Sequence, residues 1–235
     1  MPLPPRIRNL PLLLALVLVP ALPALARGTI DRVDIVGLDG EPAMEQNIRL
    51  ALGLTDALGK EQGESRLELL LLNAEDEARH ALEPFGYYSP TITVDAPRDS
   101  ADRIVVTVRV DKGEPVRVRD FQVEIAGPGG EDRYLQEDLA DFRPRPGEPL
   151  DHVVYEEHKD AITRRLAERG YFDADFLSRQ VRVTRAEGAA DIDLVWDSGF
   201  RYDMGPTTFH QEYFRPGLLE KLVTWEEGSY FHQGK

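Results

Sequence analysis

The residues that could do chemistry are scattered along this sequence. The chain of 235 residues contains five histidines and no cysteine, which excludes disulfides, thiolate metal ligands and a cysteine nucleophile. His152 and Glu156 are four residues apart on a predicted helix, but two ligands on one face do not make a metal site. Ser198-Gly199 lies outside the G-x-S-x-G pattern of hydrolase nucleophiles. We therefore expect no enzyme, no catalytic residues, no metal and no cofactor.

A glycine-rich stretch lies where a phosphate-binding loop would be expected, between a predicted strand and a predicted helix. This stretch, Gly127-Pro128-Gly129-Gly130, lacks the following Lys-Ser/Thr pair and the spacing of a dinucleotide fingerprint, which favours a turn. The 28 basic residues are outnumbered by 42 acidic ones, giving a net charge of −14. Phosphate neutralisation needs cations, so we expect no nucleic-acid partner.

The first 26 residues read as a targeting segment. Arg6 and Arg8 precede an almost wholly apolar run over residues 10–26, which ends in Ala-Leu-Ala. This pattern predicts a secretory signal peptide over residues 1–26, cleaved near Ala26. Three prolines interrupt the run and disfavour a permanent membrane span, which remains the alternative.

The elements that follow are ordered strand, helix, helix, strand, strand. Apolar alternation predicts strands, and apolar residues recurring at three to four predict helices. The predicted elements are a strand at residues 30–37, helices at 41–52 and 64–83, and strands at 91–94 and 104–110. Each has one face to bury, so we expect an α+β unit with a three-stranded sheet backed by two helices.

The same order then recurs. It predicts a strand at residues 121–127, helices at 134–142 and 151–169, and strands around 181–183 and 192–196. Gly113 is matched by Gly199, 86 residues later, and such self-similarity indicates tandem modules. A third copy begins with a strand at 207–209 and a helix at 216–223. The predicted modules are 27–112, 113–198 and an incomplete 199–235.

Each of the first two modules contains a glycine followed by two aromatic residues where its long helix ends. These corners are Gly86, Tyr87 and Tyr88, and, 84 residues later, Gly170, Tyr171 and Phe172. Glycine is the usual residue of a left-handed helix end, and the aromatic pair can fold back onto the helix. We interpret both corners as structural rather than ligand-binding.

Two strands are predicted at sheet edges, each being the first arm of a hairpin. Their residues are Thr91, Ile92, Thr93 and Val94 in the first module and Gln180, Val181, Arg182 and Val183 in the second. The unpaired backbone N–H and C=O groups of an edge strand can accept an extended polypeptide. These eight residues are the candidate polypeptide-binding site. The alternatives are a purely structural role and shielding by a neighbouring repeat.

Several stretches resemble a known family. ALEPFGYYSPTITVDAP, GEPVRVRDFQVEIAG, RRLAERGYFDADF, VWDSGFRYDMGPTTF and EKLVTWEEGSYF are similar to the POTRA modules of TamA-type proteins in the Omp85 superfamily. The resemblance implies tandem β-α-α-β-β modules at the periplasmic face of the outer membrane, ahead of a membrane barrel that is absent from this sequence. It also implies insertion or secretion of outer-membrane proteins such as autotransporters, with unfolded clients and a TamB-like inner-membrane partner.

Other readings stay open at this point. The modules also fit the arm of a BamA-type or two-partner secretion transporter, or a freestanding periplasmic scaffold that keeps its N-terminal anchor. The connections at residues 111–115 and 198–201 are short, which predicts a semi-rigid arm. We expect the sequence to be a fragment of a longer chain or a truncated form of it.

Overall fold

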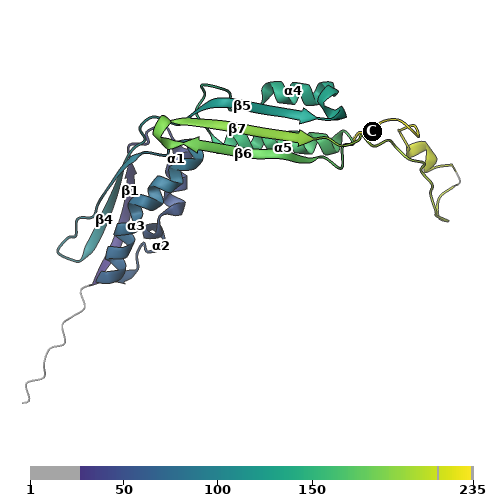
Figure 1. Cartoon of the computed structure of the whole chain (residues 1–235). Helices are drawn as coiled ribbons and strands as arrows, with labels where there is room; N and C mark the ends of the chain where they lie inside the picture. The colour runs from purple at the N-terminus through teal and green to yellow at the C-terminus, as the bar shows by residue number, and fades with distance from the viewer. Residues whose placement is uncertain (1–26, 216, 234–235) are drawn as a thin grey trace, which may run out of the picture.

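The computed structural model describes residues 27–215 and 217–233, so the predicted signal peptide lies outside the described residues. Two units, each with a sheet and helices, follow one another along an elongated chain, and a C-terminal segment extends beyond the second unit (Figure 1). The predicted α+β class with tandem units of strands and helices is confirmed.

The first module contains one strand more than the sequence predicts. Its elements are β1 (Arg27–Val36), α1 (Pro42–Ala51), α2 (Gly53–Asp56), β2 (Glu61–Gly63), α3 (Glu64–Leu82), the 3₁₀ turn η1 (Glu83–Phe85), β3 (Thr91–Asp95) and β4 (Arg103–Asp111). The sheet order is β2-β1-β4-β3, with β1 and β4 parallel. The short strand β2 has the sequence Glu-Gln-Gly, which lacks any apolar alternation, so the prediction of a three-stranded sheet was wrong here.

The second module has the three-stranded sheet and the two helices that were predicted. Its elements are β5 (Arg117–Ala126), η2 (Pro128–Glu131), α4 (Arg133–Asp141), α5 (His152–Glu168), β6 (Asp175–Thr184), η3 (Arg185–Glu187) and β7 (Ala189–Asp197). Strand β7 lies in the middle, parallel to β5 and antiparallel to β6. Both helices begin at an aspartate cap: Asp132 accepts from Tyr134 N, and Asp151 accepts from Val153 N and Val154 N.

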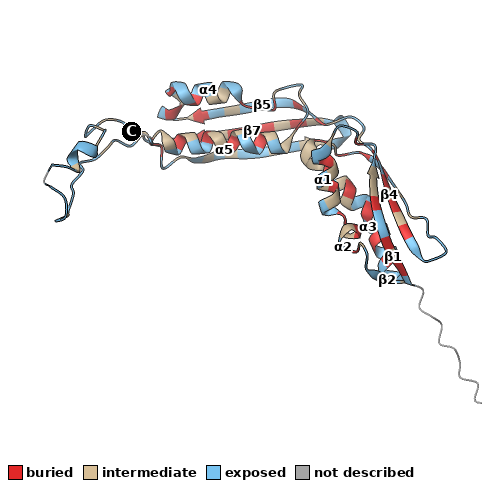
Figure 2. Cartoon of the chain, turned by 180° about the vertical axis from the view of Figure 1, so that it is seen from behind, coloured by how far each residue is buried: buried red, intermediate tan, exposed pale blue. Residues whose placement is uncertain are grey.

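Each module has its own hydrophobic core on the helix-facing side of its sheet, as the buried stripes in Figure 2 show. In the first, alternate residues of β4 pack against the apolar stripe of α3. In the second, alternate residues of β7, among them Leu194 and Trp196, are almost fully buried against the helices. The open face of each sheet is left without helices, so each module has two layers, one of helices and one of strands.

The C-terminal segment does not form the two elements predicted for a third copy. Residues 207–209 are irregular, and residues 217–223 contain only a 3₁₀ turn, η4 (Glu220–Leu222). Both predictions were wrong, and for the strand the reason is the lack of a pairing partner among the described residues. In each complete module the first strand forms a parallel pair with the last, and the described residues after 209 offer no strand for this.

Within residues 27–215 and 217–233, none of the helices combines the length and the apolar character needed to cross a membrane.

Candidate polypeptide-binding edges and the junctions between modules

The candidate residues of both modules lie on edge strands. β3 pairs only with β4, and β6 pairs only with β7. Thus Thr91, Ile92, Thr93 and Val94 lie on the edge of the first sheet, and Gln180, Val181, Arg182 and Val183 lie on the edge of the second. No other strand in the described part of the chain pairs with the outer side of either. Both edges therefore present free backbone donors and acceptors.

Edge strand β6 is longer than the predicted segment because it begins at Asp175. A bulge at Leu177 interrupts its pairing, since Phe176 is opposite Trp196 and Ser178 is opposite Val195. The bulge breaks the alternation that marks a strand in the sequence. This explains why Arg179, an exposed residue of the same edge, was missed.

The first glycine corner joins the two modules rather than serving one. Gly86 adopts the left-handed conformation, with φ of 86°. Tyr87 packs against the core of the first module, whereas Tyr88 belongs to the core of the second. The two rings therefore pack in two different cores, whereas the sequence predicts that both fold back onto the helix of their own module.

Backbone hydrogen bonds reinforce this junction. Val116 N donates to Gly86 O, and Leu150 N donates to Val116 O, both at 2.8 Å. A β carbon at position 86 would lie 2.5 Å from Leu150 O, so only glycine lets these two backbone segments approach this closely. An ion pair between Glu83 and Arg185, at 2.9 Å, also bridges the modules.

A tyrosine–histidine hydrogen bond completes the junction. Tyr88 Oη and His152 Nε2 are 2.6 Å apart. Burial lowers the pKa of His152, with Asp151, Glu156 and Glu83 opposing the shift. Burial also raises the pKa of Tyr88, and the negative charge of Glu83 raises it further. The bond therefore joins a neutral phenol to a neutral imidazole.

The second corner repeats the hydrogen-bond pattern of the first. Tyr202 N donates to Gly170 O at 2.8 Å, and Phe231 N donates to Tyr202 O at 2.9 Å. Tyr171 is buried in the second core, but Phe172 is half-exposed and its ring contacts those of Tyr202 and Phe231. The second aromatic residue thus faces the segment that follows its module.

A cation holds the connection after each module. Lys112 Nζ lies 2.7 Å from Glu41, which precedes α1, and 5.1 Å from the centre of the Tyr87 ring. Arg201 occupies the corresponding place in the second module, 3.6 Å from Asp132 and 5.7 Å from the Tyr171 ring. Each connection is therefore tied back to the module that precedes it.

The glycine-rich stretch forms a packed turn in the structure. Gly129 N donates to the hydroxyl of the fully buried Ser198, at 2.9 Å. A β carbon at Gly129 would lie 2.6 Å from that of Ser198. The glycines therefore let η2 pack against the end of β7.

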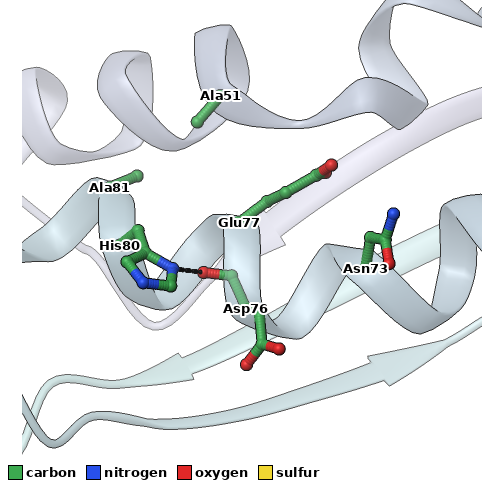
Figure 3. Close-up of a pocket in the computed structure, with 6 residues that line it drawn as sticks. All are labelled: Ala51, Asn73, Asp76, Glu77, His80 and Ala81. Atoms are coloured by element: carbon green, nitrogen blue, oxygen red, sulfur yellow. Dashed lines mark hydrogen bonds between the residues drawn. The ribbon is translucent and has the colours of Figure 1, made fainter.

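A surface hollow lies between α1 and α3 (Figure 3). Two of its polar groups are engaged in the fold: His80 Nδ1 bonds the carbonyl of Asp76, and Glu77 accepts from Gly53 N at 2.9 Å. Within the part of the chain that the structure describes, no three potential metal ligands gather in one place. His152 bonds Tyr88, and Glu156 bonds Lys159.

Both modules match known domain families. The domain family described as "POTRA domain TamA domain 1" matches residues 32–112, and the POTRA family described as "Surface antigen variable number repeat" matches residues 121–197. These stretches coincide with the two modules of the structure.

Solved structures with a similar chain course include POTRA3-5 of BamA from Haemophilus influenzae, with 18% identity, a TM-score of 0.42 and coverage of 91% of this chain and 84% of that one. POTRA1-2 of the periplasmic domain of Omp85 from Anabaena has 18% identity and a TM-score of 0.33, and the match covers 74% of this chain and 98% of that one. The two domain matches show that the chain contains two POTRA domains in tandem.

Proposed function

We propose that this chain is the periplasmic arm of an Omp85-type factor that assembles or secretes outer-membrane proteins, and that it binds unfolded client polypeptide by strand addition. The observation that carries the proposal is the pair of POTRA domains, each with an edge strand left uncovered by the described chain. Strand addition draws its affinity from main-chain hydrogen bonds, so it tolerates many client sequences. This is a binding role without covalent chemistry.

Within that class we propose a TamA-type arm, acting on clients such as autotransporters with a TamB-like inner-membrane partner. The match of the first module to the first TamA POTRA domain supports this assignment. We also propose export by a cleaved signal peptide to the periplasmic face of the outer membrane. N-terminal sequencing of the exported protein tests this: a start near Arg27 supports it, and a retained leader contradicts it.

Proline substitution on the edge strands tests strand addition. Consecutive residues of a strand point their N–H groups to opposite sides, so one residue of each pair Thr93/Val94 and Gln180/Val181 has its donor facing outward. Proline there removes a donor without breaking the pairing inside the sheet. For each pair, circular dichroism identifies the proline variant that keeps the native fold.

Affinity for an unfolded outer-membrane protein is then measured by fluorescence titration, with Val94→Thr and Val181→Thr as controls that keep the N–H group. We expect the folded proline variants to bind several-fold more weakly than the threonine controls. Equal affinities of the proline and threonine variants at both edges would refute strand addition.

A further inference from the structure

Two arginines on edge strand β6 distinguish the edge of the second module from that of the first. Arg179 and Arg182 are both exposed. Within residues 27–215 and 217–233, neither lies within salt-bridge distance of a carboxylate, although Arg119 and Arg185 nearby are both paired. The edge therefore has two positive charges that form no ion pair among the described residues, on a chain whose net charge is −14.

These arginines lie on opposite faces of the strand. Arg179 is opposite Leu194 of β7, whose side chain is buried under the helices, and Arg182 is opposite Asp191 on the open face. Arg119 binds both oxygens of Asp191, at 2.8 and 2.7 Å, and also pairs with Glu187 and Asp120, whereas Arg182 itself does not lie within salt-bridge distance of Asp191. The guanidinium of Arg179 lies 5.0 Å from the centre of the Phe176 ring.

A strand added to β6 would place its own side chains directly beside these two. Residues opposite one another on neighbouring strands interact through their side chains, and opposite charges there are favourable. Because Arg179 and Arg182 are three positions apart, their partners on the added strand are three positions apart as well, one on each face.

The edge of the first module offers no such pattern. β3 contains threonine, isoleucine and valine, and its one charged residue, Asp95, pairs with Arg109 of β4 at 3.3 Å. An anionic segment would gain nothing from pairing there. The two edges therefore differ in the charge of the segment that they favour.

We infer that β6 selects extended polypeptide segments with carboxylate side chains at two positions three residues apart. The inference rests on the strand addition proposed above and adds to it the chemical class of the preferred segment. The attraction is partly solvent-exposed, so it weakens as salt rises and the Debye length falls below about 10 Å.

The test uses three ten-residue peptides of alternating valine and threonine, with glutamate, glutamine or lysine at two positions three apart. The full chain is expected to bind the glutamate peptide about three- to ten-fold more tightly than the glutamine peptide, and the lysine peptide most weakly. In R179E/R182E the order is expected to reverse. The matched control R66E/R164E changes the net charge equally at exposed helical positions and is expected to keep the original order.

The outcomes separate this inference from the function on which it rests. If the folded proline variant of the Gln180/Val181 pair loses all three peptides while R179E/R182E keeps the original order, strand addition stands and charge selection is wrong. If that proline variant binds as the unaltered chain does, strand addition at β6 is itself wrong. Equal binding of the three peptides by the unaltered chain, or binding of none, also overturns the inference.

Discussion

At the scale of single residues, glycine at position 86 decides whether the two modules can meet. Its positive φ is a conformation that residues with a β carbon adopt at a cost. Gly40 has a similar φ of 84°, but a β carbon there would meet nothing within 4 Å. The two glycines therefore separate the conformational penalty from the penalty of close approach to Leu150.

We predict that Gly86→Ala destabilises the protein more than Gly40→Ala does. Gly40→Ala pays only the left-handed conformation, about 1 kcal/mol. Gly86→Ala has the same conformational cost and must also displace Leu150 O, which a β carbon would approach to 2.5 Å. The free energy of unfolding from urea titrations measures both costs, and equal losses would show that the close approach at the junction is unimportant.

At the scale of elements, the junction between η1 and α5 is sensitive to pH through His152. Its pKa is lowered by burial, so the unfolded chain binds a proton at this position more readily than the folded chain. As pH falls below about 6.5, the ordinary value for histidine, folding stability is lost until the lowered pKa is reached, and no more is lost below it.

His152→Gln tests this prediction because glutamine keeps a hydrogen-bond acceptor for Tyr88 but does not titrate. We expect the pH dependence of unfolding below 6.5 to become flatter in this variant. His210 is exposed, and His210→Gln serves as the control, with an unchanged profile expected. A steep profile retained in His152→Gln would assign the acid sensitivity to other groups.

The elements also show how far the site follows from the sequence. All eight candidate residues lie on edge strands, because hairpins of alternating apolar residues are local patterns. Arg179 could not be found in this way, since the bulge at Leu177 breaks the alternation. A bulge is defined only by the partner strand.

At the scale of the whole molecule, two cores are joined through a narrow junction. Leu166 is fully buried in the second core and Leu82 in the first. Each module buries its own apolar surface, so each is expected to resist local unfolding largely by itself. Tyr88 provides the main side-chain link, because it leaves the first module and packs in the second.

We predict that Leu166→Ala destabilises the second module by about 2 to 5 kcal/mol, the usual cost of a cavity in a core. Amide hydrogen exchange in β1 and β4 is expected to change little, while exchange in β5 and β7 accelerates. Leu82→Ala is the reciprocal control and should loosen the first module. Equal acceleration in both modules from either variant would mean that the chain unfolds as one cooperative unit.

The sequence by itself determined the tandem arrangement, the order of the longer helices and strands of each module and the left-handed glycines that follow the long helices. These features depend on residues close together in the chain, where periodicity and turn chemistry are direct physical signals. Only the tertiary structure decided that Tyr88 packs in the neighbouring core, that β2 adds a fourth strand and that residues 207–209 stay irregular. Each of these depends on partners distant in sequence, because a ring needs a cavity and a strand needs a neighbour to bond.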